Sequence, residues 1–177
     1  MRNVTTAITS FCLAAFLGMV TLSAPVSAEE TNEQGLTAEQ AVSLNEAIQA
    51  AKQSYSQRKY RDAVESYHQA LQIYNQDFLT FYNIGVSYRG LKEEDSAQVY
   101  LGQAIQLNPQ FGPARLALAT SYLKTNNLGR AEQTYTSVTT ELADSMQYVM
   151  AAHEGLYKVA NGLAIQAERA RRQQEYD

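Results

Sequence analysis

Small and apolar residues recur along this chain at an interval of 34 residues. Between them, apolar side chains follow a helical period, as in the segment 42–51. A unit of 34 residues with small side chains in fixed places indicates paired helices that approach closely, each pair burying its apolar face against the next pair. The recurrent columns are Ala51, Gly85 and Ala119; Ala63, Ala97 and Ala131; Tyr67, Leu101 and Tyr135; and Ala70, Ala104 and Val138.

The unit 78–111 carries the most complete motif. Its first predicted helix contains an aromatic residue, an apolar residue, a glycine and a tyrosine in that order, and its second contains an alanine and ends before a proline. These residues are Phe81, Ile84, Gly85, Tyr88, Ala97 and Pro109, with Leu101 in place of a second aromatic residue. In this motif the chain resembles the tetratricopeptide repeat family. The units 44–77 and 112–145 keep the columns but lack the closing proline.

The resemblance implies an all-α fold, an α-solenoid of stacked helix-turn-helix pairs in a right-handed superhelix. We expect three repeats, 44–77, 78–111 and 112–145, followed by a degenerate C-terminal capping repeat over 146–177 with a turn at Asn161 and Gly162. One long continuous helix over this last segment is the alternative. The segment 134–140 is rich in β-branched residues that favour a strand, but the repeat register predicts a helix there.

Residues 1–28 differ in composition from the rest of the chain. Arg2 is their only charge, residues 11–22 are mostly apolar, and small residues lead up to Ala28. This pattern predicts a secretory signal peptide cleaved before Glu29, and hence an exported protein, periplasmic (or in an equivalent envelope compartment) or secreted. An uncleaved anchor is the alternative, but the apolar run is shorter than the ~20 residues that span a bilayer. The sole cysteine, Cys12, lies in this segment.

Residues 29–36 are polar and aperiodic, which predicts a flexible leader. A capping box at Thr37 and Gln40 predicts that the repeat domain, 37–177, begins there.

The predicted mature chain offers little for catalysis or for binding cofactors. It has two histidines, His68 and His153, no thiol and no glycine-rich phosphate loop, so we expect no enzyme activity, metal or cofactor. Its 13 basic and 18 acidic residues are dispersed, which argues against nucleic acid as a partner. A short basic run, 169–172, is typical of a solvated helix face.

The family resemblance also implies a binding surface. In these proteins the first helix of each repeat lines a concave groove that receives a peptide segment of a partner protein. The subset that clamps the carboxylate ends of heat-shock chaperones is excluded, because only Asn83 matches its motif, while Ile48, Lys52, Pro113 and Ala117 occupy its other positions. Carried over by register, the groove residues are Ile48, Lys52, Leu79, Tyr82, Asn83, Val86, Arg89, Leu116, Thr120, Leu123 and Lys124, with Tyr55, Met150 and Tyr157 as extensions.

These residues predict an apolar and aromatic groove with a basic fringe at Lys52, Arg89 and Lys124. Such a surface suits an apolar or aromatic peptide that carries some negative charge. The sequence therefore predicts a protein-interaction adaptor or scaffold in a bacterial envelope. The alternatives are a self-associating structural subunit that stacks through its solenoid ends, and a small enzyme that depends on His68 or His153.

Overall fold

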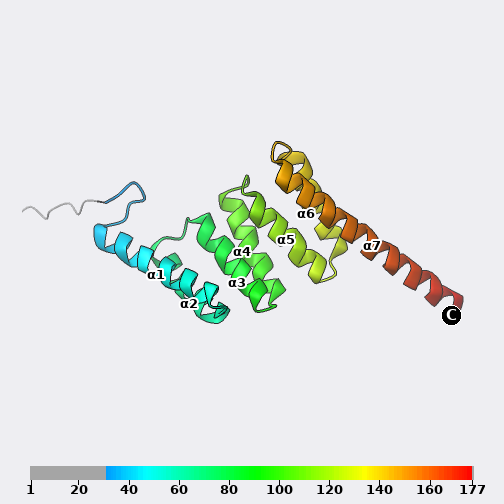
Figure 1. Cartoon of the computed structure of the whole chain (residues 1–177), viewed down its shortest axis with the longest axis horizontal. Helices are drawn as coiled ribbons and strands as arrows, with labels where there is room; N and C mark the ends of the chain where they lie inside the picture. The colour runs from blue at the N-terminus through cyan, green and yellow to red at the C-terminus, as the bar shows by residue number, and fades with distance from the viewer. Residues whose placement is uncertain (1–30, 177) are drawn as a thin grey trace, which may run out of the picture. The chain divides into compact units, whose positions relative to one another are not determined.

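The computed structural model describes residues 31–176, and the predicted signal peptide lies outside them. Within this range the chain forms seven helices and no strand beyond one isolated bridge between Thr31 and Thr37 (Figure 1). The helices are α1 (Ala38–Ser56), α2 (Tyr60–Ile73), α3 (Phe78–Gly90), α4 (Glu94–Leu107), α5 (Gly112–Lys124), α6 (Leu128–Glu141) and α7 (Met146–Tyr176).

The first six helices form three antiparallel pairs, and each pair packs on the next. The fold is therefore the predicted all-α solenoid; α3 and α5 begin at residues 78 and 112 of the predicted register, whereas α1 begins at Ala38, before the predicted start at 44. The β-branched segment 134–140 is helical, because Tyr135 and Val138 are buried in the core between α6 and α7.

The small-residue columns mark the close contacts between paired helices. In the central repeat, a Cβ at Gly85 of α3 would lie 2.7 Å from Cγ of Leu101 on α4. Ala97, one turn before Leu101, is fully buried in the same contact. Tyr67, in the equivalent place to Leu101 one repeat earlier, is also buried, and its burial raises its pKa to about 12.

Local side-chain contacts determine where several helices begin. Thr37 and Gln40 form the predicted capping box, in which each side chain binds the other residue's backbone N–H. The carboxylate of Asp77 accepts hydrogen bonds from the backbone N–H groups of Leu79 and Thr80 at the start of α3. Asn127 caps α6, because its side-chain oxygen accepts a hydrogen bond from the backbone N–H of Arg130.

The loop before α1 has more structure than its composition predicted. The side chain of Asn32 accepts hydrogen bonds from the backbone N–H groups of Gln34 and Leu36. Gly35 has a positive φ of 75°, a conformation that glycine adopts without strain. Leu36 is buried. Residues 31–37 therefore form a hydrogen-bonded turn that leads into the first helix.

The last segment is one continuous helix, so the fourth helix pair expected from the sequence is wrong. Helix α7 passes through Asn161 and Gly162 without a turn. A Cβ at Gly162 would lie 2.9 Å from a methyl carbon of Leu128, so glycine here allows α7 to lie close to α6. A single glycine in a helix lowers its stability by only ~1 kcal/mol. The close packing of α7 against Leu128 offsets part of that cost.

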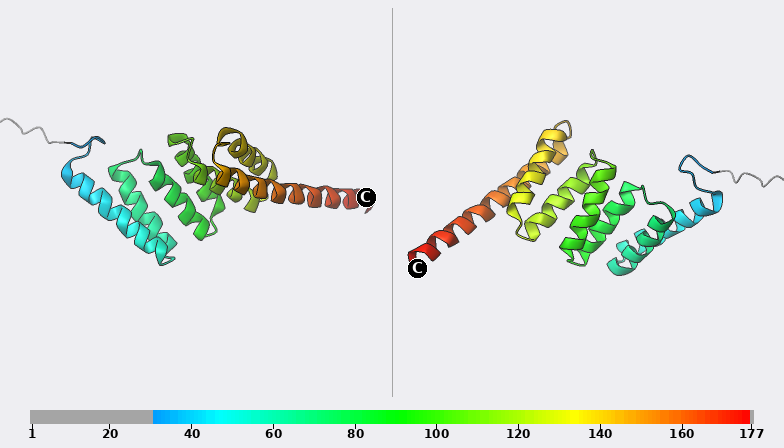
Figure 2. Two further views of the ribbon diagram at one scale, coloured as in Figure 1. Left: turned by 45° about the horizontal axis from the view of Figure 1, so that its top comes forward. Right: turned by 180° about the vertical axis from the view of Figure 1, so that it is seen from behind.

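Beyond its contact with α6, the carboxyl-terminal end of α7 projects from the repeats in every view (Figure 2). Gln166 of this helix donates a hydrogen bond to the side-chain oxygen of Asn126 in the third repeat. Ion pairs of Glu168 with Arg171 and Arg172 then stabilise the exposed end. No helix within residues 31–176 has the length and apolar character needed to cross a membrane.

Candidate functional site

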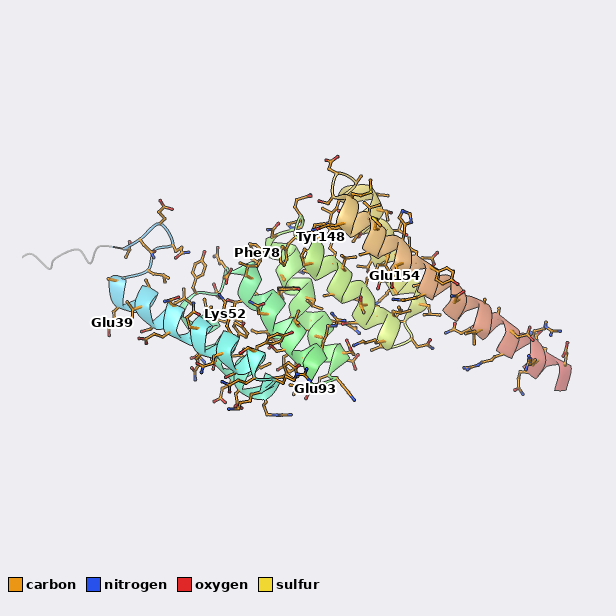
Figure 3. All side chains as sticks on the ribbon, in the orientation of Figure 1. Glu39, Lys52, Phe78, Glu93, Tyr148 and Glu154 are labelled. Atoms are coloured by element: carbon orange, nitrogen blue, oxygen red, sulfur yellow. The ribbon has the colours of Figure 1, made fainter. Side chains whose placement is uncertain are left out.

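The predicted groove is best formed along α3, the first helix of the central repeat. Leu79 is 44% exposed, and Tyr82, Asn83 and Val86 are half-buried on the following turns. On α1, Ile48 is half-buried, whereas Lys52 and Tyr55 are exposed (Figure 3). This arrangement offers apolar surface that remains reachable from solvent. We call these seven residues of α1 and α3 the open groove: Ile48, Lys52, Tyr55, Leu79, Tyr82, Asn83 and Val86.

Tyr82 lies among aromatic side chains from several parts of the fold. Its ring meets that of Phe111 edge-on, with centroids 5.1 Å apart, and Phe78 makes a similar contact with Phe111 at 5.0 Å. Burial raises the pKa of Tyr82, and the nearby hydroxyls of Tyr55 and Tyr148 raise it further, while the charge of Arg89 opposes them. Tyrosines from α1, α3 and α7 therefore come close enough to interact.

Phe111 and Tyr148 were missed by the sequence analysis. Phe111 lies in the loop before α5, where no helical period marks it as a packing residue. Tyr148 packs directly over Gly112, since a Cβ there would lie 2.5 Å from the tyrosine ring. Gly112 stands where the earlier repeats have the larger residues Leu44 and Phe78. A glycine at this position leaves room for a side chain from elsewhere in the fold, and it is the sequence signal that could have predicted the contact with Tyr148.

The predicted basic fringe is largely neutralised within the protein. The carboxylate of Glu94 lies 2.9 Å from the ammonium of Lys124 and 3.8 Å from Nε of Arg89. The Glu94 side chain is only 11% exposed, whereas that of Lys124 is 52% exposed. Lys52 differs, because it is exposed and has no ion pair within residues 31–176. Lys52 is therefore the fringe cation without an ion pair in the described chain, whereas Arg89 and Lys124 share Glu94, and their role toward a ligand stays a prediction.

The groove residues predicted in the third repeat are engaged by the end of the solenoid. Leu116 and Leu123 pack against the core cluster that α6 and α7 complete. The hydroxyl of Thr120 donates to the backbone oxygen of Leu116 and lies 2.9 Å from the hydroxyl of Tyr135. These three residues are half-buried and also take part in the packing of the last helices, so their place in the groove stays a prediction.

Helix α7 carries exposed apolar side chains at the positions predicted to extend the groove. Met150 is 65% exposed and Tyr157 is 69% exposed. Met146 lies on the same helical face and is also exposed.

The described residues hold no group of three or more histidine, aspartate and glutamate side chains that could bind a metal ion. Nε2 of His68 lies 3.2 Å from the hydroxyl of Tyr100, in an aromatic cluster. His153 is exposed on α7. Neither histidine has a serine, threonine or carboxylate as a hydrogen-bond partner among the described residues.

Comparison with known proteins agrees with this architecture. A sequence profile described as tetratricopeptide repeat matches residues 88–152. Residues 88–152 are therefore identified as tetratricopeptide repeat sequence, and the described helix pair before them has the same fold. No match was found among curated proteins.

Solved tetratricopeptide repeat domains share the fold at low sequence identity. The Sgt2 domain from Aspergillus fumigatus is 17% identical, with a TM-score of 0.62 over 81% of this chain and 88% of that one. The TPR2B domain of yeast Sti1, solved as a complex with pHsp70, is 19% identical, with a TM-score of 0.63 over 68% of this chain and 98% of that one. The Hsp90 co-chaperone Cns1 from Saccharomyces cerevisiae is 15% identical, with a TM-score of 0.67 over 78% of this chain and 46% of that one.

Proposed function

We propose that this tetratricopeptide repeat protein is an exported interaction adaptor, in the periplasm or an equivalent bacterial envelope compartment or secreted, that binds a segment of a partner protein in the open groove. The observation that carries the proposal is the half-buried Tyr82 on α3, whose ring lies edge-on against Phe111, with the exposed Leu79 one turn before it. Rigid aromatic side chains in such positions are the common anchors of protein interfaces. Export rests on the sequence of residues 1–28 alone.

The chemistry of the groove indicates the kind of segment it binds. Leu79, Val86 and the tyrosine rings favour aliphatic or aromatic side chains, and Lys52 supplies the unpaired positive charge. A partner segment with apolar anchors and an acidic residue placed near Lys52 meets both requirements. The Sti1 domain of the same fold was solved as a complex with pHsp70, which supports partner binding as the class of function.

The proposed partner is not a chaperone carboxyl terminus. The positions that hold the clamp residues in that subset carry Ile48, Lys52, Pro113 and Ala117 here. Pro113 and Ala117 have no charge, and Ala117 is buried. A terminal carboxylate would therefore find no cluster of cations at this site.

Selection from a peptide library tests the proposal and does not require the partner to be identified. Peptides selected on the purified protein are measured against a groove variant, Lys52→Glu with Leu79→Ala. We expect the affinity of the groove variant for these peptides to fall about tenfold or more, equivalent to 1.4 kcal/mol. The variant loses both the apolar contact of Leu79 and the positive charge of Lys52. The matched control is Lys59→Glu with Leu107→Ala, since Leu107 on α4 is 43% exposed and Leu79 is 44% exposed.

The control variant should bind as the wild type does. Equal affinity of all three proteins for the selected peptides would contradict the groove proposal. Intact-mass analysis of the exported protein tests the proposed export. We expect a mass that corresponds to cleavage before Glu29, and a mass that retains Met1 would contradict the predicted signal peptide.

Self-association through the solenoid end is the second candidate function. The observation that favours it is the exposed face of α7 that carries Met146, Met150 and Tyr157. Sedimentation over a range of protein concentrations distinguishes the two candidate functions. The mass of an adaptor stays that of a monomer, whereas the mass of a stacking subunit increases with concentration. The Met150→Glu substitution should abolish this increase.

A further inference from the structure

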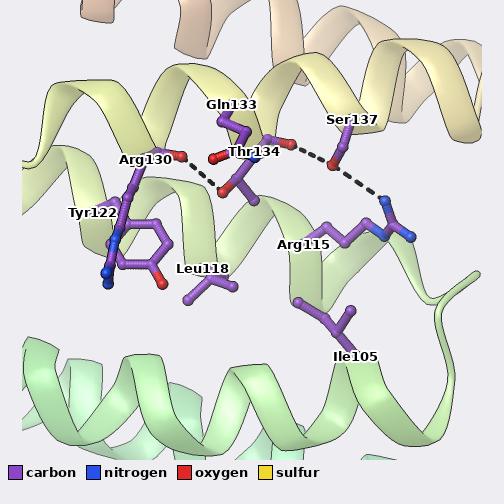
Figure 4. A pocket seen from close by; sticks show the side chains of 8 residues that line it. All are labelled: Ile105, Arg115, Leu118, Tyr122, Arg130, Gln133, Thr134 and Ser137. Atoms are coloured by element: carbon purple, nitrogen blue, oxygen red, sulfur yellow. Dashed lines mark hydrogen bonds between the residues drawn. The ribbon is translucent and has the colours of Figure 1, made fainter.

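A second candidate binding site lies on the side of the solenoid formed by the second helices of the repeats. A cavity of about 390 Å³ opens between α4, α5 and α6 (Figure 4). Its volume falls in the lower part of the range of ~300–1,000 Å³ found for small-ligand sites. Ile105 forms its floor, Leu118 and Tyr122 form its back wall, and Thr134 points into it from α6, as Figure 4 shows.

At the equivalent positions between the first and second repeats the side chains form an aromatic cluster, and a separate cavity of about 340 Å³ beside it is lined in part by His68 and Tyr88. The ring of Tyr100 lies nearly parallel to that of Tyr88, with an angle of 18° and centroids 5.4 Å apart. Phe81 stacks on Tyr100 at 6.5 Å, and the hydroxyl of Tyr100 lies 3.2 Å from Nε2 of His68. Tyr100 is therefore the central residue of this interface.

One repeat later, only one member of that cluster remains. Adding 34 to each number gives Tyr122 in place of Tyr88, but Thr134 in place of Tyr100 and Gly102 in place of His68. A Cβ at Gly102 would meet no atom within 4 Å. The cavity thus occupies the place where the repeat architecture elsewhere holds an aromatic ring.

The fourth position holds Arg115 in place of Phe81, and its side chain does not fill the space. Nε donates to the backbone oxygen of Pro109 at 2.9 Å, and Nη1 donates to Oγ of Ser137 at 3.1 Å. Nη2 pairs with Glu141 at 2.6 Å. These bonds hold the guanidinium at one end of the cavity and satisfy its charge, so Arg115 acts as a wall.

Arg130 supplies an available charge at the opposite end. Its guanidinium lies 5.6 Å from the centre of the Tyr122 ring, in a cation–π contact. The side chain is exposed, and no carboxylate within residues 31–176 forms an ion pair with it. The cavity therefore combines an aromatic wall with an unpaired cation at its edge.

We propose that this cavity is a second binding site, which receives an aromatic side chain of a partner polypeptide. The ring lies against Tyr122 as Tyr100 lies against Tyr88, and an acidic residue next to it in the partner pairs with Arg130. This site lies outside the open groove and does not depend on the function proposed for that groove.

Nuclear magnetic resonance titration of the isotope-labelled protein tests the site directly. The probes are three capped tetrapeptides with the sequences AEYA, AELA and AQYA. We expect AEYA to shift the amide signals of Leu118, Tyr122 and Thr134, and to bind about tenfold more tightly than AELA. Equal binding of the tyrosine and leucine peptides, or shifts confined to other residues, would overturn the proposal.

Two variants make the test independent of any single substitution. Thr134→Tyr restores the residue found at position 100, so it should fill the cavity, raise the melting temperature and abolish the shifts. Thr140→Tyr makes the same change at an exposed position of α6 and should keep them. Arg130→Gln should remove the preference for AEYA over AQYA while the tyrosine peptides still bind.

Retention of AEYA binding in a folded Thr134→Tyr protein would contradict the proposed location. If Thr134→Tyr does not fold, Arg130→Gln decides, because an unchanged preference for AEYA would contradict the role of the charge. The groove variant Lys52→Glu with Leu79→Ala should bind AEYA at the cavity as the wild type does. Failure of this site is thus separable from failure of the groove.

Discussion

Replacing Gly155 by alanine should destabilise the protein although alanine is the better helix former. Gly155 lies in α7, and a Cβ at this position would be only 2.3 Å from Cζ of Tyr135 and 2.4 Å from Cε1. Carbon atoms in contact normally lie about 3.5–4.0 Å apart. The substitution therefore requires α7 or the Tyr135 ring to move by more than an ångström.

Neither element can move freely. Tyr135 is 4% exposed, and its hydroxyl lies 2.9 Å from Oγ1 of Thr120 on α5. A shift of the ring weakens this hydrogen bond, which contributes ~0.5–1.5 kcal/mol, and overpacking a core costs ~1–3 kcal/mol. Alanine returns ~0.5–1 kcal/mol in helix propensity. The free energy of unfolding should therefore fall by about 1–3 kcal/mol.

Gly102→Ala is the matched control, because it makes the same change inside α4 where a Cβ would meet no atom within 4 Å. This variant gains propensity without a clash and should be more stable than the wild type by ~0.5–1 kcal/mol. Urea denaturation followed by far-ultraviolet circular dichroism measures both. Opposite signs for the two variants are expected. A Gly155→Ala protein as stable as Gly102→Ala would refute the close packing of α7 on Tyr135.

Two further predictions concern the turns and the pH dependence of stability. Arg58 and Lys92 occupy equivalent turns with positive φ values of 60° and 65°. Glycine adopts this left-handed backbone without steric cost, although it loses more conformational entropy on folding. Changing either residue to glycine should therefore raise the free energy of unfolding by ~0.5 kcal/mol, measured from the urea midpoint. Asn126→Gly, at the same turn of the third repeat, should gain less because asparagine tolerates this conformation; equal gains at all three turns would contradict this account. The hydrogen bond and the charge of Arg115 lower the pKa of Glu141, so this pair stabilises the fold above the ordinary carboxyl pKa of 4.5 and stops doing so as the pH falls through the lowered value. Urea midpoints should show Glu141→Gln to be less stable than the wild type at neutral pH. In strong acid, where the carboxyl group of Glu141 is protonated, the two proteins should be equally stable. The same difference in stability at both pH values would count against the ion pair.

The sequence by itself determined the repeat architecture of this protein. Gly85, Ala97 and their equivalents recur every 34 residues because paired helices meet at the same points in each unit, so the all-α repeat fold can be predicted from the sequence. The helix starts at Thr37 and Asp77 were also predictable, because a capping side chain acts on backbone groups two or three residues away.

The binding surfaces were decided by the tertiary structure. Glu94 neutralises Arg89 and Lys124, and Tyr148 lies over Gly112, through contacts between residues of different helices that no local pattern records. Helix α7 stays continuous at Gly162 because Leu128, on another helix, packs against the space that a side chain would fill. The cavity beside Tyr122 exists because substitutions in three separate helices remove rings from one place. Helix period and capping depend on neighbours along the chain, whereas charge pairing and open volume depend on which side chains the folded solenoid brings together.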